Sequence, residues 1–149
     1  MNARSLVLTG LAAALSLPAS TAAAAVGDGT FIYSKQGRLL ASIREVKSLD
    51  TRTRLWSFAG RRDCSVTFTN TGINVILRRA IVGRAVPAGY GRWNVASNDL
   101  SLRLGSVGRQ SRDRWTIRSA RGTVVGFTRG PAGPAAAAAW LLLPASCLK

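Results

Sequence analysis

The sequence predicts an all-β protein, a small antiparallel barrel of about eight strands. From Thr30 onward, apolar residues recur at every second position in short bursts, which is the period of half-buried strands. Glycine, asparagine, aspartate and serine separate the bursts and favour tight turns. The chain has 149 residues, a length typical of one domain with one core. Many short strands joined by tight turns indicate a barrel or a sandwich.

The expected strands lie, in order, around residues 31–33, 39–43, 55–58, 66–69, 75–77, 93–95, 100–104, 115–117 and 124–127. Residues 135–143 allow two interpretations. Pro134 is well placed to open a short helix through the alanine run. We favour a loop that leads into a final strand, because Trp140 is followed by apolar residues, as at the starts of other expected strands.

The N-terminus has the pattern of a secretory signal peptide. Arg4 precedes an apolar run from Leu6 to Leu17, and small residues follow up to Ala25. The run is shorter than the roughly 20 apolar residues that span a membrane. We therefore expect a signal peptide over residues 1–25, a single all-β domain over residues 26–149, and a periplasmic or secreted location.

Export bears on the two cysteines, Cys64 and Cys147. In an oxidising compartment a disulfide is the usual state of such a pair. We expect the two to be bonded; the alternative is two unpaired, buried thiols.

The composition argues against catalysis. The chain has no histidine, and Glu45 is its single glutamate. It therefore lacks the residues for the usual metal-binding sites and for a histidine-based catalytic triad. We expect no enzyme activity, no metal and no cofactor.

The net charge of +15 comes mostly from arginine, which accounts for eighteen of the 21 basic residues. Guanidinium groups match phosphate, sulfate and carboxylate well. The anion-binding candidates are the pairs and cluster members Arg61, Arg62, Arg78, Arg79, Arg112, Arg114 and Arg118. The alternative is a solvated surface without a binding role. Tyr90 lies between two glycines and is the best candidate for an exposed aromatic side chain.

A weak repeat suggests a second fold. Strand and glycine units end at Gly37, Gly72 and Gly108, about 35 residues apart. A threefold repeat of this length is typical of a β-trefoil, which we keep as the alternative fold.

A second pattern of residues occurs once along the chain and does not repeat. It consists, in order, of Trp56, Cys64, Val66 and Phe68 in alternation, Gly72, Pro87 and Trp93. Over Leu55 to Leu104 it resembles the bacterial periplasmic metalloprotease inhibitors, the alkaline proteinase inhibitor family. The resemblance implies an eight-stranded barrel whose N-terminal segment inhibits a protease by entering its cleft. By this analogy, the inhibitory residues are Val26, Gly27 and Asp28. Ile81 stands where the second cysteine of that family falls.

The sequence thus predicts an exported binding protein without catalysis, an inhibitor of a secreted protease by resemblance. The alternative is a barrel or trefoil module that binds anionic glycan or lipid headgroups through its arginine surface. The expected partner is a secreted protease or an anionic surface polymer, and peripheral contact with an anionic membrane is compatible with the charge. We expect a monomer and no nucleic-acid partner, because nucleic acid is not the usual polyanion outside the cytoplasm.

Overall fold

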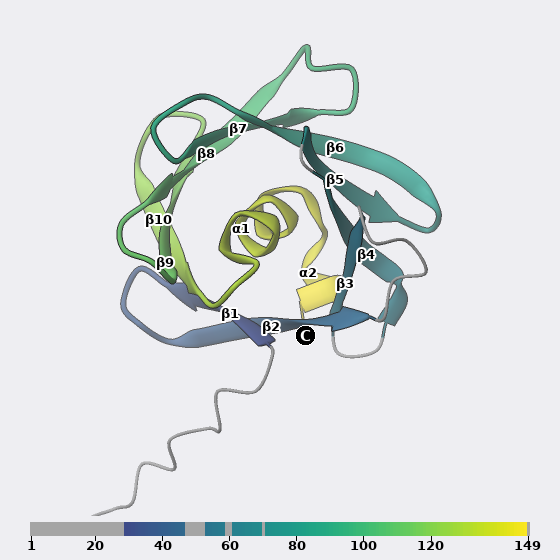
Figure 1. Cartoon of the computed structure of the whole chain (residues 1–149), viewed down its shortest axis with the longest axis horizontal. Helices are drawn as coiled ribbons and strands as arrows, with labels where there is room; N and C mark the ends of the chain where they lie inside the picture. Colours follow the sequence, from purple (N-terminus) through teal and green to yellow (C-terminus); the bar gives the residue numbers. More distant parts are fainter. Residues whose placement is uncertain (1–28, 47–52, 59–60, 70, 149) are drawn as a thin grey trace, which may run out of the picture.

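The computed structural model describes residues 29–46, 53–58, 61–69 and 71–148 of the chain. These residues form ten antiparallel strands that close into a barrel, with a helix inside it (Figure 1). The strands are β1 (Gly29–Ser34), β2 (Leu39–Val46), β3 (Arg54–Phe58), β4 (Arg61–Thr69), β5 (Gly72–Leu77), β6 (Ala80–Pro87), β7 (Arg92–Ser97), β8 (Arg103–Arg109), β9 (Arg114–Ser119) and β10 (Val124–Arg129). The helices are α1 (Gly133–Leu142) and α2 (Ala145–Leu148).

Each strand pairs with its neighbours in sequence, and pairing of β1 with β10 closes the ring. Closure leaves no unpaired strand edge. The predicted all-β barrel is confirmed, but the described residues form ten strands rather than about eight. The strand order is that of a meander and not the threefold arrangement of a trefoil.

The strand that the sequence patterning missed is β6. Its inward positions carry Gly83 and Ala85, so the apolar alternation is weak there. Arg84 is exposed between them, and Pro87 ends the strand. The interior needs small residues at these positions because a helix lies close to them.

Helix α1 runs through the interior of the barrel, where Figure 1 shows it surrounded by strands. It contacts β1 and all the strands from β4 to β10. Its alanines, Ala135 to Ala139, are fully buried. A helix that is apolar on all sides is stable only when it is surrounded, and alanine lets its backbone approach the strands closely.

The expected final strand over residues 135–143 is therefore wrong. The pairing of β1 with β10 leaves no free edge for another strand. Pro134 lies in the first turn of α1, where its missing N–H group costs nothing. The alternative interpretation, a short helix opened by Pro134, is confirmed.

Glycines on two strands make room for the leucines of α1. A Cβ atom at Gly83 would overlap the side chain of Leu142 and the carbonyl oxygen of Ala96, and one at Gly105 would overlap the carbonyl oxygen of Arg118 and the side chain of Leu141. Around the helix, the inward side chains include Ile32, Ile43, Val66, Val75, Val95, Val107 and Ile117, all fully buried.

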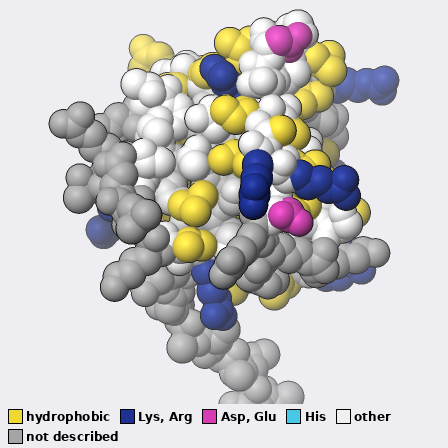
Figure 2. Space-filling model, turned by 90° about the vertical axis from the view of Figure 1, so that its right-hand side faces the viewer, with side chains coloured by type: hydrophobic (Ala, Val, Ile, Leu, Met, Phe, Trp, Pro, Cys, Tyr) yellow, Lys and Arg dark blue, Asp and Glu magenta, His cyan; other side chains and the backbone are white. Residues whose placement is uncertain are grey.

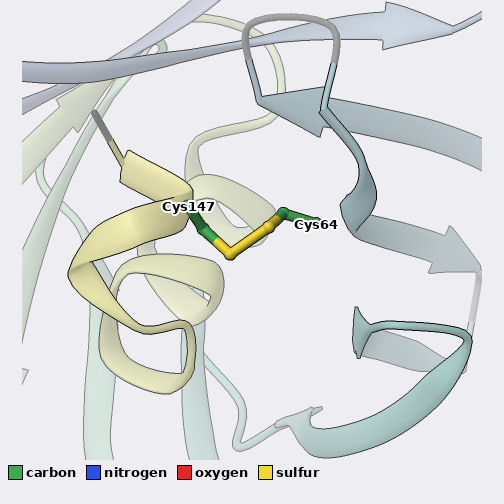
Figure 3. The surroundings of a disulfide bond; sticks show 2 residues. All are labelled: Cys64 and Cys147. Carbon is green, nitrogen blue, oxygen red and sulfur yellow. A yellow bond between two sulfur atoms is a disulfide. The ribbon is translucent and has the colours of Figure 1, made fainter.

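The disulfide between Cys64 and Cys147 is present, as predicted (Figure 3). It joins α2 to β4, with 5.9 Å between the Cα atoms. The bond therefore anchors the C-terminal segment to the wall of the barrel. It is compatible with an extracellular or periplasmic protein.

In a meander, alternate turns lie at the same end of the barrel. We call the end that holds α2 and Cys64 the disulfide end; the turns β1–β2, β5–β6, β7–β8 and β9–β10 lie there. The turns β6–β7 and β8–β9 and the connection from β10 to α1 lie at the opposite end. In the described part of the chain, no helix has the length and apolar character needed to cross a membrane.

Candidate anion-binding groove

The outer face of β7, β8 and β9 carries two rows of mostly polar residues that strand pairing places side by side. Side chains of alternate residues point to the same face of a sheet. The rows across the three strands are Asn94–Ser106–Arg118 and Arg92–Gly108–Thr116. These six residues line one surface groove of about 650 Å³, which we call the basic groove.

Gly108 forms the open floor of the basic groove. A Cβ atom at this position would meet no other atom within 4 Å. Its backbone does not have the positive φ that requires glycine. The absence of a side chain at Gly108 therefore leaves space without being needed for the fold.

The charge of the basic groove is positive and uncompensated. Arg92, Arg103, Arg109 and Arg118 all line it, and no acidic residue does. Within the described residues, the ion pair found is Glu45 with Arg54, far from these arginines in the strand order. Four guanidinium groups without a carboxylate partner favour a bound anion.

Two of these arginines are anchored by the backbone. The Nε of Arg109 donates a hydrogen bond to the carbonyl of Ser111 at 3.2 Å, and its guanidinium lies 5.8 Å from the ring centre of Trp115. One terminal nitrogen of Arg118 donates to the carbonyl of Gly122 at 3.0 Å. Such contacts fix the side chains before a ligand arrives and reduce the entropy lost on binding.

A second hollow of about 280 Å³ adjoins the basic groove and shares Gln110, Thr116 and Arg118 with it. It adds Lys35 and Arg114 to the cationic surface. The guanidinium of Arg114 lies 4.1 Å from the ring centre of Phe127, within the range of a cation–π contact. The positive surface thus continues from β7 to β9 and reaches Lys35 in the β1–β2 turn.

The predicted anion-binding residues do not form one site. Arg114 and Arg118 lie together on the outer face of β9. Arg112 is exposed in the β8–β9 turn, where its carbonyl faces Arg109. Arg78 and Arg79 form the β5–β6 turn, and Arg61 and Arg62 open β4, with side chains outside the described set.

The prediction missed Arg92 and Arg103, which line the basic groove with Arg118. Neither belongs to a dense cluster in the sequence. The alternation of Arg92 and Asn94 on one strand was a usable signal, but the strand register that pairs them with β8 is not visible in the sequence. Tyr90 is fully exposed, as predicted, in the turn whose Gly91 carbonyl accepts a hydrogen bond from the backbone of Arg109.

The predicted signal peptide over residues 1–25 and the predicted inhibitory residues Val26, Gly27 and Asp28 lie outside the described residues. Both remain predictions. Among the described residues, no group of three or more His, Cys, Asp or Glu side chains is placed to hold a metal. Comparisons with protein-family models, curated proteins and solved structures gave no match.

Proposed function

We propose that this protein is a non-catalytic binding protein that takes a multiply charged anionic ligand in the basic groove. The observation that carries the proposal is the convergence of Arg92, Arg103, Arg109 and Arg118 on one groove without an acidic residue in its lining. Sulfate, phosphate and carboxylate groups all suit guanidinium donors. Asn94, Ser106 and Thr116 add neutral polar groups for hydroxyls.

The shape of the site favours an extended ligand over a single ion. The basic groove of about 650 Å³ continues into the neighbouring hollow of about 280 Å³, and the arginines are spread along its length. An acidic oligosaccharide has charges and hydroxyls distributed in this way. We therefore expect a polyanionic glycan to bind more tightly than free sulfate or phosphate.

The first prediction concerns this site. We expect a heparin-derived octasaccharide to bind, and the double variant Arg92→Gln/Arg103→Gln to lose affinity by roughly tenfold or more per arginine, because charge-assisted hydrogen bonds contribute about 1.5–3 kcal/mol each. Gly108→Leu, which fills the floor without changing charge, should weaken binding as well. Isothermal titration calorimetry at moderate salt measures both effects.

The control is Arg38→Gln/Arg44→Gln, which removes the same charge from exposed positions on or beside β2. This variant should keep most of the affinity. Equal losses in the two double variants, with no effect of Gly108→Leu, would show that binding depends on net charge and not on the groove. Inhibition of a secreted metalloprotease, lost on trimming Val26 to Asp28, would instead support the inhibitor hypothesis.

A further inference from the structure

Four described residues other than glycine have a positive φ, and three of them lie at the disulfide end of the barrel. Leu100 (φ 63°) lies in the β7–β8 turn, while Arg78 (φ 50°) and Arg79 (φ 69°) form the β5–β6 turn. The two turns are neighbours at this end, because β6, which follows one turn, pairs with β7, which precedes the other. Residues in this conformation are uncommon, and they gather at functional sites more often than elsewhere.

The chain provides its own comparison for Leu100. Three turns at the disulfide end share one hydrogen-bond pattern, in which an N–H group donates to the carbonyl of a serine three residues earlier. The three donor–acceptor pairs are Gly37–Ser34, Gly122–Ser119 and Leu100–Ser97. The donor residue has a positive φ in all three turns, and two of the turns use glycine there. Leucine is thus the exception at a position that suits glycine.

The fold gains little from this leucine. Leu100 is 53% exposed and Leu102 is 59% exposed. The β7–β8 turn is held instead by Asp99, whose carboxylate accepts hydrogen bonds from the hydroxyls of Ser97 and Ser101. An apolar side chain kept at an exposed and unfavourable position points to a partner outside the fold.

The neighbouring residues indicate the chemistry of that partner. Pairing of Gly83 with Ser97 places Ile81, which is also exposed, beside the β7–β8 turn. Arg103 begins β8 just after Leu102. We call the set Arg78, Arg79, Ile81, Leu100, Leu102 and Arg103 the leucine-arginine corner. The carboxylate of Asp99 lies in the same turn and accepts hydrogen bonds from Ser97 and Ser101, so the three arginines leave the corner with a net positive charge. Figure 2 shows the side of the molecule that lies at the right of Figure 1, around β4 to β6, where hydrophobic side chains lie among Lys and Arg.

We propose that the leucine-arginine corner docks the protein on the surface of an anionic phospholipid bilayer. The aliphatic side chains enter the boundary between headgroups and acyl chains, and the arginines contact the lipid phosphates. A two-residue turn such as that of Arg78 and Arg79 usually carries asparagine and glycine. The use of two cations there, next to exposed leucines, fits an anionic and partly apolar surface better than it fits water.

A soluble polyanion would explain the arginines but not the leucines. An apolar groove on a protein partner would explain the leucines but not the cations. The bilayer accounts for both. The inference does not depend on the basic groove, although Arg103 lies at the end of both surfaces.

The second prediction tests this docking by flotation with vesicles. The protein should bind vesicles of equimolar phosphatidylglycerol and phosphatidylcholine and bind vesicles of phosphatidylcholine alone weakly. Leu100→Gly combined with Leu102→Ser should lower the partition coefficient about tenfold or more, because two aliphatic side chains no longer leave water. Arg78→Asn/Arg79→Gly should lower it too, and this loss should vanish at high salt.

These variants are chosen so that unfolding does not explain a loss, because Leu100→Gly, Arg78→Asn and Arg79→Gly each place a favoured residue at a positive φ and Leu102 is exposed. Their melting temperatures should equal or exceed that of the parent. Tyr90→Gly is the matched control, since Tyr90 is also exposed with a positive φ (48°) but lies at the opposite end. It should leave vesicle binding unchanged.

Unchanged vesicle binding in the leucine variant would overturn the proposal. So would a leucine variant that loses binding to the octasaccharide as strongly as to vesicles, because the corner would then be part of a soluble-ligand site. The proposed function of the basic groove is tested separately. If the groove binds the octasaccharide, Gly108→Leu should reduce octasaccharide binding and leave vesicle binding unchanged. If Gly108→Leu does not affect octasaccharide binding, the groove proposal fails without affecting the membrane proposal.

Discussion

At the scale of single residues, Asp99 shows how side chains fix a turn. Its carboxylate accepts hydrogen bonds from the Ser97 hydroxyl, from the Ser101 hydroxyl at 2.8 Å and from the Ser101 backbone N–H at 3.1 Å. The Ser97 hydrogen bond, followed by those from Ser101, lowers the pKa of Asp99 from 3.8 to about 2. These donors prefer the ionised carboxylate. They hold the turn that presents Leu100.

The third prediction follows from the direction of this shift. The pKa of Asp99 is lower in the folded chain than in the unfolded chain, so its contribution to stability is complete above pH 3.8 and is lost as the pH falls toward 2. Ser97→Ala should raise the pKa of Asp99 toward 3.8. A carbon-detected NMR titration of the carboxyl group measures this change.

Ser119→Ala is the control, because Ser119 has the same backbone role in the β9–β10 turn and does not contact Asp99. It should leave the pKa of Asp99 unchanged. If Ser97→Ala also leaves it unchanged, the Ser97 hydroxyl is not the main cause of the low value.

At the scale of elements, most strands were predictable and α1 was not. One expected strand, over residues 100–104, was displaced, because β8 begins only at Arg103 and Leu100 lies in the turn before it. Around Phe31, Trp56 and Val66, apolar and polar residues alternate, which indicates a strand with one buried face. This pattern can be recognised within a few consecutive residues. Residues 135–143 are apolar throughout, so the pattern has no polar face that separates a helix from a buried strand. The pairing of β1 with β10 excludes a further strand and so decides for the helix. This pairing is a property of the whole barrel, so the sequence of residues 135–143 alone does not reveal it.

The candidate site was predictable in part for the same reason. Arg114 and Arg118 stand out because they alternate with Trp115 and Ile117 on β9. Arg92 joins them only through the pairing of β7 with β8 and of β8 with β9. Register between strands depends on turn lengths and bulges, such as the one between Val95 and Ala96, which sequence patterning does not fix.

The fourth prediction concerns the packing of α1. Ala137 is fully buried within the barrel, so Ala137→Leu should destabilise the fold by about 1–3 kcal/mol or more through overpacking. Alanine and leucine have similar helix propensities, so the loss reports packing. Urea denaturation followed by tryptophan fluorescence measures the free energy of unfolding.

Ala145→Leu is the matched control, because Ala145 is exposed in α2. It should change the free energy of unfolding by less than about 0.5 kcal/mol. An equal and small effect at both positions would mean that α1 is not enclosed as tightly as its burial indicates.

At the scale of the whole molecule, three features act together: the ring of strands has no edge, α1 fills its interior, and the disulfide holds α2 against β4. The C-terminal segment must enter the barrel for Cys147 to reach Cys64. The two surfaces proposed for binding lie on the outside of this scaffold, on the β7 to β9 wall and at the disulfide end. Their geometry therefore depends on the stability of the closed ring.

The fifth prediction is that the disulfide supplies a large part of that stability. The two cysteines are 83 residues apart, so the bond removes much loop entropy from the unfolded chain, equivalent to roughly 4–5 kcal/mol in the chain-entropy model. Cys64→Ala/Cys147→Ala should lower the free energy of unfolding by about this amount, measured by urea denaturation. The double variant is used because a single substitution would leave a reactive thiol.

The same experiment separates the bond from the packing around it. Reduction of the parent protein with dithiothreitol should reproduce the loss seen in the double variant, and dithiothreitol should not affect the double variant itself. A loss below about 1 kcal/mol in both would show that α1 holds the C-terminal segment in the barrel without the bond. In that case the reduced protein should still bind vesicles and the octasaccharide. If the free energy of unfolding instead falls by about 4–5 kcal/mol in the double variant and in the reduced parent protein, both should bind vesicles and the octasaccharide more weakly as the temperature approaches their lowered melting point.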